Sequence, residues 1–436
     1  MKILFPALLT IAAFGLAGFA QTRTLSPFER RANDIVAVIN DPKDLEKIFS
    51  TDFLAQVPPA QVSEISKQIT TGYGKALRIE KIEKTGEHTG KITVAFEREF
   101  FAYMDLSIEN KEPFLVNGLR VTSIDKGSNS LEDIIGELKK LPGQTALTVA
   151  RLGAGDFQSI AAHNADKPLA IGSTFKLYIL SELVRSIAAG ERKWSDTIEL
   201  TEKSLPSGVM QNWETGAPVT FHTLASMMIS ISDNTATDQL ITALGREKIE
   251  KMLSTAGNSN PALSVPFLKT AEMFKIKGSG KRNLASIYAA EDASGKRALL
   301  ANEIAVFKTG DIDLKDFLKK PTYISQIEWF ASTNDLARAM NWLRLNSEKS
   351  PTERARGILT INKALPPDEA ANWNYVGYKG GSETGVISLT YLLQSKKSEW
   401  FVLSATWNDE NAPVKDDEFV FLVQKAVKIL REKTAQ

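Results

Sequence analysis

The sequence predicts a two-part α/β (α+β) fold: a small α+β domain, then a larger sandwich in which an antiparallel sheet packs against a helical block. Three observations lead to this prediction. The chain has 436 residues, which is enough for two domains. Segments with the alternating pattern of strands stand at both ends of the second part, and the residues between them have mostly helical periodicity. We therefore expect the larger sheet to be assembled from both ends of its domain.

Residues 26–126 are predicted to form the small α+β domain, because helix-like apolar spacing is followed by three β-rich runs. The expected helices are Pro27 to Asn40 and Pro59 to Gln68, with one further turn at Asp44 to Phe49, and the expected strands are Ala76 to Lys84, Lys91 to Met104 and Phe114 to Ile124. No acid or base in this domain is expected to be catalytic.

Aromatic residues crowd the middle one of these strands. Because side chains alternate between the two faces of a strand, Phe96 and Phe100 are predicted on one face and Phe101 and Tyr103 on the other. We interpret the rings as the core of a curved sheet; the alternative is a cup for a ligand. The layout is similar in outline to the cone of the NTF2/steroid-isomerase type.

Residues 131–436 are predicted to form the larger domain, after a linker at Gly127 to Ser130. A helix at Leu131 to Leu141 should end at the Pro-Gly pair that follows it. The expected strands are Gln144 to Gly153, Phe157 to Asn164, Val386 to Gln394 and Trp400 to Trp407, and Phe419 to Lys433 is a closing helix.

Composition excludes several classes of function. Apolar and charged contents of 43% and 24% are ordinary for a globular protein, and a net charge of +1 gives no electrostatic reason to expect nucleic acid or an anionic membrane surface as a partner. The chain has no cysteine, which excludes disulfides and thiolate metal sites. Its three histidines, His88, His163 and His222, are too scattered for a typical zinc site. We expect no metal and no cofactor.

The first twenty residues have the pattern of a secretory signal peptide. Lys2 supplies a positive charge, an almost unbroken apolar run follows it to Phe19, and Gly18 and Ala20 place small residues at a cleavage position. An uncleaved anchor is the alternative. We therefore predict a signal peptide at residues 1–20, no stable membrane span after its cleavage, and a periplasmic or secreted mature protein.

The first chemical motif is Ser-x-x-Lys at Ser173 and Lys176. Three residues are about one helical turn, so both side chains project on the same side of the predicted helix. Apolar residues follow on more than one helical face, which indicates a helix buried in the domain centre. Burial and a nearby cation disfavour the charged form of a lysine, so Lys176 could serve as the base that activates a nucleophilic Ser173. A capping serine followed by a solvated lysine is the alternative.

The second motif, Ser232-Asp233-Asn234, interrupts two apolar helical runs. A polar break of this kind is often only a helix cap. Here hydroxyl and amide groups stand at a helix–helix corner, where they can point toward the core. We predict that Ser232 passes a proton to the leaving group and that Asn234 binds the substrate's amide, whereas His222 is a surface residue.

Two lysines compete for the role of a second cation. Lys308 precedes a polar turn, whereas Lys379 precedes the strand at Val386 to Gln394. A cation at the mouth of a pocket must be held rigidly, so we choose Lys379 and interpret Lys308 as solvated. Gly381 permits close backbone approach for substrate binding, and the N–H of Ser382 is a candidate oxyanion donor.

The three motifs in this order resemble those of the penicillin-recognising serine hydrolases, nearest to class A β-lactamases and related β-lactamase-like proteins. The resemblance covers about residues 131–433 and implies a β-lactamase/transpeptidase-like sandwich. It implies a small-molecule amide or ester substrate, such as a β-lactam or a peptidoglycan fragment. The implied site comprises Ser173 as nucleophile, Lys176 as general base, Ser232 as proton relay, Asn234 as substrate-binding residue and Lys379 as electrostatic residue.

The chain also departs from the class A pattern. No Glu-x-x-Leu-Asn loop follows the second motif; Glu272 is the only acid near the corresponding position, and is our candidate for the deacylation base. Gly380 replaces a hydroxyl residue that helps to hold a β-lactam carboxylate, and the strand around Leu389 offers no arginine for the same purpose.

Three functions remain open. The first is a secreted serine hydrolase that forms an acyl-enzyme on Ser173, with weak β-lactamase or esterase activity. The second is a peptidoglycan D-Ala-D-Ala carboxypeptidase or transpeptidase, which the missing loop glutamate would allow. The third is a non-catalytic penicillin-binding or sensor module whose serine reacts slowly or not at all.

Overall fold

The structure is a computed structural model that describes residues 25–98, 100–125, 130–205, 207–308, 310, 312–313 and 319–435. The predicted signal peptide and the first three residues of the predicted linker lie outside these ranges. The chain divides into two compact units, Met1–Ser128 and Asn129–Gln436. Among the helices described, none is long and apolar enough to cross a membrane.

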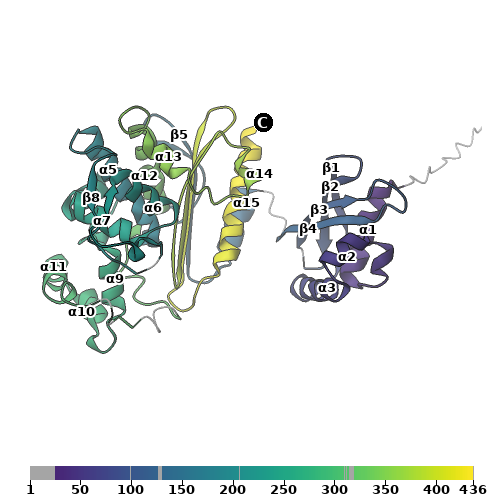
Figure 1. Ribbon diagram of the computed structural model, residues 1–436, viewed down its shortest axis with the longest axis horizontal. Coiled ribbons are helices and arrows are strands. Elements are labelled where there is room, and N and C mark those ends of the chain that lie inside the picture. The colour runs from purple at the N-terminus through teal and green to yellow at the C-terminus, as the bar shows by residue number, and fades with distance from the viewer. Residues whose placement is uncertain are drawn as a thin grey trace, which may run out of the picture. The chain divides into compact units, whose positions relative to one another are not determined.

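The smaller unit is a four-stranded antiparallel sheet with the strand order β1-β2-β3-β4 and with helices packed on it (Figure 1). Its first helix starts at Pro27, where the Ser26 hydroxyl accepts the N–H of Glu29 and the Glu29 carboxylate accepts that of Ser26. The core lies between this helix and the sheet. The elements are α1 (Pro27–Asn40), η1 (Leu45–Lys47), α2 (Thr51–Gln56), α3 (Pro59–Tyr73), β1 (Ala76–Lys84), β2 (Thr89–Phe96), β3 (Phe101–Ile108) and β4 (Val116–Asp125).

The single strand predicted at Lys91 to Met104 is wrong, because this segment is the hairpin of β2 and β3. The backbone N–H of Phe96 donates to the carbonyl of Phe100 at 2.8 Å and closes the turn. The Arg98 guanidinium donates to carbonyls at the end of α3, which holds the turn in place. Phe96 and Phe100 nevertheless pack against one core, as their predicted common face requires.

The larger unit contains a five-stranded antiparallel sheet in the order β11-β12-β13-β5-β6, so both ends of this unit contribute strands, as predicted (Figure 1). The strands are β5 (Gln144–Leu152), β6 (Phe157–His163), β11 (Tyr375–Glu383), β12 (Val386–Gln394) and β13 (Trp400–Asn408). β11, which carries Lys379, is the edge strand next to β12. Short two-stranded pairs join β7 (Leu169–Ala170) to β10 (Phe330–Ala331) and β8 (Thr197–Glu199) to β9 (Pro218–Thr220).

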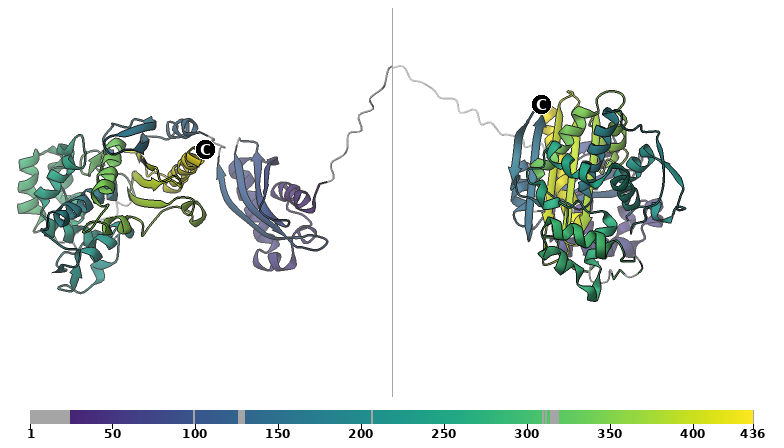
Figure 2. Two further views of the ribbon diagram at one scale, coloured as in Figure 1. Left: turned by 90° about the horizontal axis from the view of Figure 1, so that it is seen from above. Right: turned by 90° about the vertical axis from the view of Figure 1, so that its left-hand side faces the viewer.

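Each face of this sheet has its own core. On β13, Val402 packs into the core under the helical block, whereas Leu403 packs into the core on the opposite face, because successive side chains point to opposite sides. Helices α4 (Leu131–Leu138) and α15 (Asp416–Ala435) cover that opposite face, and Figure 1 shows α15 lying along the sheet. The two views of Figure 2 show the helical block on the other side.

The helical block surrounds α5, whose side chains are buried from Lys176 through Val184, as the apolar residues on more than one face predicted. Its helices are α5 (Lys176–Ala188), α6 (Phe221–Ser230), α7 (Asn234–Leu244), α8 (Arg246–Thr255), α9 (Thr270–Lys277), α10 (Leu284–Ala290), α11 (Ala293–Leu299), α12 (Thr333–Asn346), α13 (Arg354–Leu359) and α14 (Pro367–Ala370). Ser173 lies in the 3₁₀ turn η2 (Gly172–Phe175), and the α-helix begins at Lys176.

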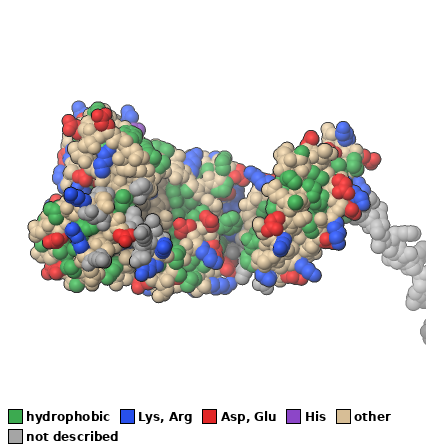
Figure 3. Space-filling model, turned by 60° about the horizontal axis from the view of Figure 1, so that its bottom comes forward, with side chains coloured by type: hydrophobic (Ala, Val, Ile, Leu, Met, Phe, Trp, Pro, Cys, Tyr) green, Lys and Arg blue, Asp and Glu red, His purple; other side chains and the backbone are tan. Residues whose placement is uncertain are grey.

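Charged side chains of both signs are interspersed on the face that Figure 3 shows. This distribution accords with the net charge of +1.

Candidate active site

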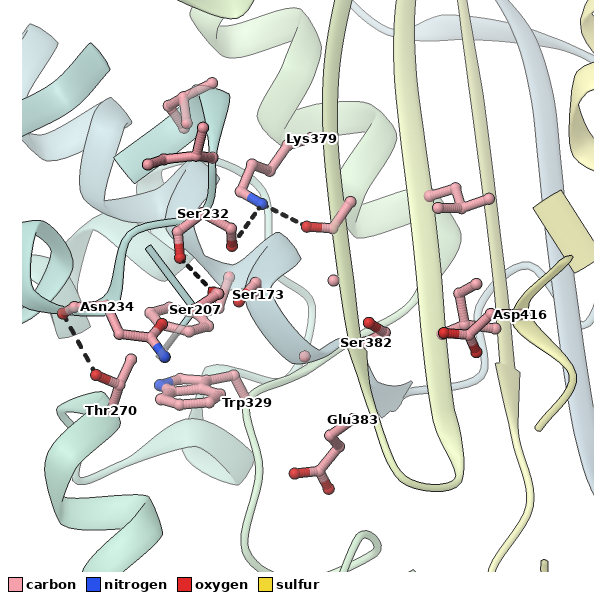
Figure 4. Close-up of a pocket in the computed structure, with 18 of the residues that line it drawn as sticks. Ser173, Ser207, Ser232, Asn234, Thr270, Trp329, Lys379, Ser382, Glu383 and Asp416 are labelled. Carbon is pink, nitrogen blue, oxygen red and sulfur yellow. Dashed lines mark hydrogen bonds between the residues drawn. The ribbon is translucent and has the colours of Figure 1, made fainter. Parts of the chain in front are cut away.

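The three sequence motifs meet at one cavity of about 550 Å³. Ser173 comes from η2, Ser232 and Asn234 from the corner between α6 and α7, and Lys379 from β11. Figure 4 shows these side chains gathered around the cavity. Gly381 and Ser382 also line it. Lys176 does not line the cavity but contacts Ser173, Ser232 and Asn234, so Glu272 is the one predicted site residue that the structure leaves apart. Ser173 is partly exposed, so its hydroxyl is not sealed from solvent.

Lys176 is fully buried and contacts Ser173, Ser232 and Asn234 of the first two motifs. Its Nζ lies 3.1 Å from Ser173 Oγ, 3.0 Å from Ser232 Oγ, 2.7 Å from the Ser232 carbonyl and 2.8 Å from Asn234 Oδ1. Burial, and then the Lys379 cation, lower the pKa of Lys176 well below its usual value, although Asp238 and Asp233 act in the opposite direction. The amine is therefore poised to be neutral.

Neutral Lys176 has the right number of donors for these contacts. The Ser232 carbonyl and Asn234 Oδ1 can only accept, so they use the two N–H bonds of the neutral amine. One lone pair then remains for a hydroxyl hydrogen, from either Ser173 or Ser232. This arrangement gives the amine the capacity to take the proton of Ser173.

Ser232 lies between the two lysines. Its Oγ is 3.1 Å from the Nζ of Lys379, in addition to its contact with Lys176. Its backbone adopts a left-handed conformation with φ of 58°, which costs energy for a residue with a Cβ. The Ser207 hydroxyl donates to the Ser232 carbonyl at 2.7 Å and helps to hold this conformation. A hydroxyl in contact with both amines is suited to proton transfer between them.

Lys379 is buried on the edge strand and also donates to the Gly380 carbonyl. Burial lowers its pKa to about 7. The site therefore holds two amines of lowered pKa, joined through the hydroxyl of Ser232.

Asp233 anchors the corner, a role that the sequence motif did not reveal. Its buried carboxylate accepts the N–H of Ala236 at 2.9 Å and so caps α7. It also accepts the N–H groups of Val209 and Met210, at 2.6 and 2.9 Å. The carboxylate thereby fixes the loop that carries Ser207 to the helix that carries Asn234.

Hydrogen bonds to both the oxygen and the nitrogen of the Asn234 amide fix its orientation. Its Oδ1 accepts from Lys176, and its Nδ2 donates to the Leu205 carbonyl at 3.1 Å. The residue is buried in the protein but lines the cavity. Asn234 therefore presents a fixed amide edge to whatever occupies the cavity.

Two glycines let β11 approach the turn that carries Ser173. An ideal Cβ built on Gly381 would lie 2.3 Å from the Ser173 nitrogen, and one on Gly172, whose φ is +46°, would lie 3.0 Å from the Ser382 nitrogen. The two backbones thus run closer together than side chains would allow. This proximity brings the backbone segments that carry the N–H groups of Ser173 and Ser382 close together at the cavity.

The strand register turns the Ser382 N–H toward the free edge of β11. Thr384 and Gly385 form a two-residue loop, so Glu383 and Val386 flank the loop as a hydrogen-bonded pair. Such pairs alternate with non-hydrogen-bonded pairs, and Ser382 belongs to one of the latter. Its N–H therefore points away from β12 and is free to meet an oxyanion.

Lys308 and Glu272 do not line the cavity that contains Ser173. Lys308 is exposed outside any helix or strand, as expected for a solvated lysine. Glu272 was the candidate deacylation base, but it does not line the cavity. Arg246 donates to both of its carboxylate oxygens, at 3.0 and 2.6 Å, and the N–H of Lys269 donates to it at 2.8 Å. A carboxylate held this way is a structural ion pair, so that expectation is corrected.

Thr270 faces the cavity in place of an acid. Its hydroxyl and its N–H both donate to the buried Asp238, at 2.8 and 2.6 Å. The hydroxyl also lies 3.4 Å from the Asn234 carbonyl. The start of α9 is thereby joined to α7.

Tyr378 occupies the space above Gly380. An ideal Cβ on Gly380 would lie 2.0 Å from the Tyr378 hydroxyl oxygen. Tyr378 lines the cavity, and burial raises the pKa of its phenol, which keeps the phenol protonated. The Tyr378 hydroxyl therefore fills the space that a side chain at Gly380 would occupy.

Sequence reasoning missed several other lining residues, because no short motif marks them. They are Ser207, Thr270, Glu328, Trp329, Tyr378, Glu383 and Asp416. Within the described ranges, histidine, aspartate and glutamate form no group of three suited to a metal ion.

Residues 128–328 match the model of the beta-lactamase enzyme family. Among solved structures, the beta-lactamase from Sphaerobacter thermophilus is 18% identical with a TM-score of 0.50, and the match covers 70% of this chain and 97% of that one. A variant of the last common ancestor of Gram-negative bacteria beta-lactamase class A is 15% identical with a TM-score of 0.50, over 70% and 99% of the two chains. No curated protein matches significantly. The larger unit has a β-lactamase-like fold, which confirms the predicted fold class.

Proposed function

We propose that the larger unit is a serine hydrolase that forms an acyl-enzyme on Ser173 with a small amide or ester. The observation that carries the proposal is the buried Lys176 amine, 3.1 Å from the Ser173 hydroxyl and depressed in pKa by burial and by Lys379. A base of this kind activates a serine without a histidine.

The reaction follows from the geometry. Lys176 takes the Ser173 proton as Oγ attacks the substrate carbonyl, and the N–H groups of Ser173 and Ser382 receive the oxyanion. The tetrahedral intermediate collapses when its bond to the leaving group breaks. The proton held on Lys176 reaches that leaving group through Ser232, whose hydroxyl contacts both lysines. Asn234 binds the substrate amide, and Lys379 stabilises negative charge on the substrate.

Release of the acyl group is proposed to be slow. Glu272 is paired with Arg246 and so cannot activate a water in the cavity. This supports weak β-lactamase or esterase activity, and it favours a D-Ala-D-Ala carboxypeptidase or transpeptidase as the second candidate. A penicillin-binding sensor is the third. The signal-peptide pattern of residues 1–20 supports a periplasmic or secreted location.

Intact-mass spectrometry over time separates these functions. The purified protein is treated with a penicillin and, separately, with a fluorophosphonate. A transient penicillin adduct on Ser173 supports the hydrolase, and a lasting one supports the second or third candidate. If neither reagent forms an adduct, acyl-enzyme chemistry is refuted.

The rate of fluorophosphonate labelling should fall on acidification, because protonated Lys176 cannot act as a base. Lys379→Ala should shift this acid limb to higher pH, since loss of the neighbouring cation raises the pKa of Lys176. The measurement is the labelling rate constant against pH, with Lys308→Ala as the control. If the acid limb of the rate profile stays in place or moves to lower pH in Lys379→Ala, the charge of Lys379 does not lower the pKa of Lys176.

A further inference from the structure

Three ionisable side chains, Lys277, Glu328 and Glu383, form a buried cluster at the cavity. Lys277 Nζ donates to Glu328 Oε1 at 2.7 Å and to Glu383 Oε1 at 2.6 Å. The Lys277 and Glu328 side chains are 0% exposed, and that of Glu383 is 8% exposed. Both glutamates line the cavity that contains Ser173. The Ser-x-x-Lys chemistry uses none of the three.

The second oxygens of the two glutamates indicate a shared proton. Oε2 of Glu328 and Oε2 of Glu383 are buried without a hydrogen-bond partner among the described residues, if both groups are ionised. Two buried carboxylates around one ammonium are costly. Burial and then the neighbouring charge of Glu328 raise the pKa of Glu383 well above its usual value, and the hydrogen bond with Glu328 adds to the rise, although Lys277 opposes it. One proton between the two groups satisfies both oxygens and leaves the cluster neutral.

The cluster joins the two walls that hold the oxyanion donors. On one wall, Glu383 follows Ser382 directly in β11. On the other, Glu328 precedes Trp329, whose carbonyl accepts the N–H of Ile171 at 3.1 Å. The Trp329 ring also stacks on Phe175, with centroids 3.7 Å apart and planes 14° apart. Glu328 is thereby tied to both sides of the turn that contains Ser173.

We propose that Glu328 and Glu383 share one proton, and that this pair, held by Lys277, positions the Ser382 N–H against the Ser173 turn. The three are positioning residues, since they act through the backbone of their neighbours. Ionisation of the pair would set two buried carboxylates against each other and part the two walls. Lys277 and Glu328 are the charged groups that act on Glu383 among the residues described. The effect on labelling rests on the proposed function.

Two variants of Glu383 test the proposal. Glu383→Gln mimics the protonated acid, since its amide can donate to Glu328 and accept from Lys277. It should label with fluorophosphonate like the wild type at neutral pH. Glu383→Leu cannot make these bonds, and its maximal labelling rate should fall about 100-fold, the loss typical for one oxyanion donor. A merely structural role would lower the unfolding temperature without changing that maximal rate in the folded protein.

The shared proton has its own signature in thermal unfolding. A carboxyl pKa that is raised in the folded state contributes stability below the ordinary glutamate pKa and loses it as pH rises through the raised value. The unfolding midpoint of the wild type should therefore fall relative to that of Glu383→Gln as pH increases. Infrared spectra should show a carboxylic acid band in the wild type that Glu383→Gln lacks.

Glu399→Gln is the matched control, because Glu399 pairs with Arg151 at the end of the same sheet, away from the cavity. This variant should leave the labelling rate unchanged. Its unfolding midpoint should change with pH in parallel with that of the wild type. The proposal is overturned if the unfolding midpoints of Glu383→Gln and the wild type change in parallel with pH. It is also overturned if Glu383→Leu is labelled at the wild-type rate. If the wild type is not labelled at all, the proposed function fails, and the unfolding series still tests the shared proton.

Discussion

Replacement of Lys176 by methionine should abolish covalent labelling of Ser173 by both a penicillin and a fluorophosphonate. The variant keeps a long apolar side chain in the core but has no amine to take the serine proton. General bases contribute about 10²–10⁴-fold to such steps. We expect the labelling rate constant, measured by intact-mass spectrometry, to fall by at least about 100-fold. Lys176→Ala should lose labelling in the same way.

The fold of these variants must be checked separately. Removal of the amine leaves Asn234 Oδ1 without its donor, whereas the Ser232 carbonyl keeps the Ser207 hydroxyl, and a buried unsatisfied acceptor costs about 1–3 kcal/mol. Circular dichroism and a thermal midpoint establish that the variant is folded at the assay temperature. Lys308→Ala is the control and should label normally, since Lys308 is exposed. Labelling of folded Lys176→Met at the wild-type rate would refute the role of the lysine.

Periodicity and short motifs were sufficient to predict the larger unit. Strand patterns near the two ends of this unit identified the split sheet, and the apolar surroundings of Lys176 identified α5 as a buried helix. The pairing of the nucleophile with its base was equally predictable, because Ser173 and Lys176 are one helical turn apart in sequence. Local spacing determines such contacts, so they can be derived without coordinates.

The hairpin of β2 and β3 illustrates where local patterns fail. The segment between Phe96 and Phe101 contains no glycine, proline or asparagine to mark a turn. The turn is instead held by long-range contacts, such as the hydrogen bonds from Arg98 to the end of α3. Polar residues within a β-rich run do not reveal such contacts.

The site residues that the sequence did not predict also depend on contacts between distant parts of the chain. Glu272 was chosen for its distance along the chain, but Arg246, 26 residues away, sets its orientation. Lys277 meets Glu328 and Glu383 across 51 and 106 residues. The ionisation of such groups depends on partners that only the tertiary fold brings together, so no window of sequence predicts it.

Replacement of Gly381 by alanine should reduce labelling of Ser173 about 100-fold, because an oxyanion donor would be lost from its position. The added Cβ would lie 2.3, 2.4 and 2.5 Å from the Ser173 nitrogen, the Ile171 oxygen and the Thr174 nitrogen. All three are backbone atoms, so no side chain can rotate away to relieve the contact. β11 must move off the turn, and the Ser382 N–H moves with it.

The matched control is Gly136→Ala, since Gly136 lies in α4 with no described atom within 4 Å of its ideal Cβ. That variant should label normally and gain about 0.5–1 kcal/mol of stability from helix propensity. Gly381→Ala should instead lose about 1–3 kcal/mol through overpacking. The labelling rate and a denaturant titration of both variants measure these effects. Wild-type labelling by Gly381→Ala would show that close approach of β11 to the serine turn is not required for acylation, and the two N–H groups would lose their assigned role.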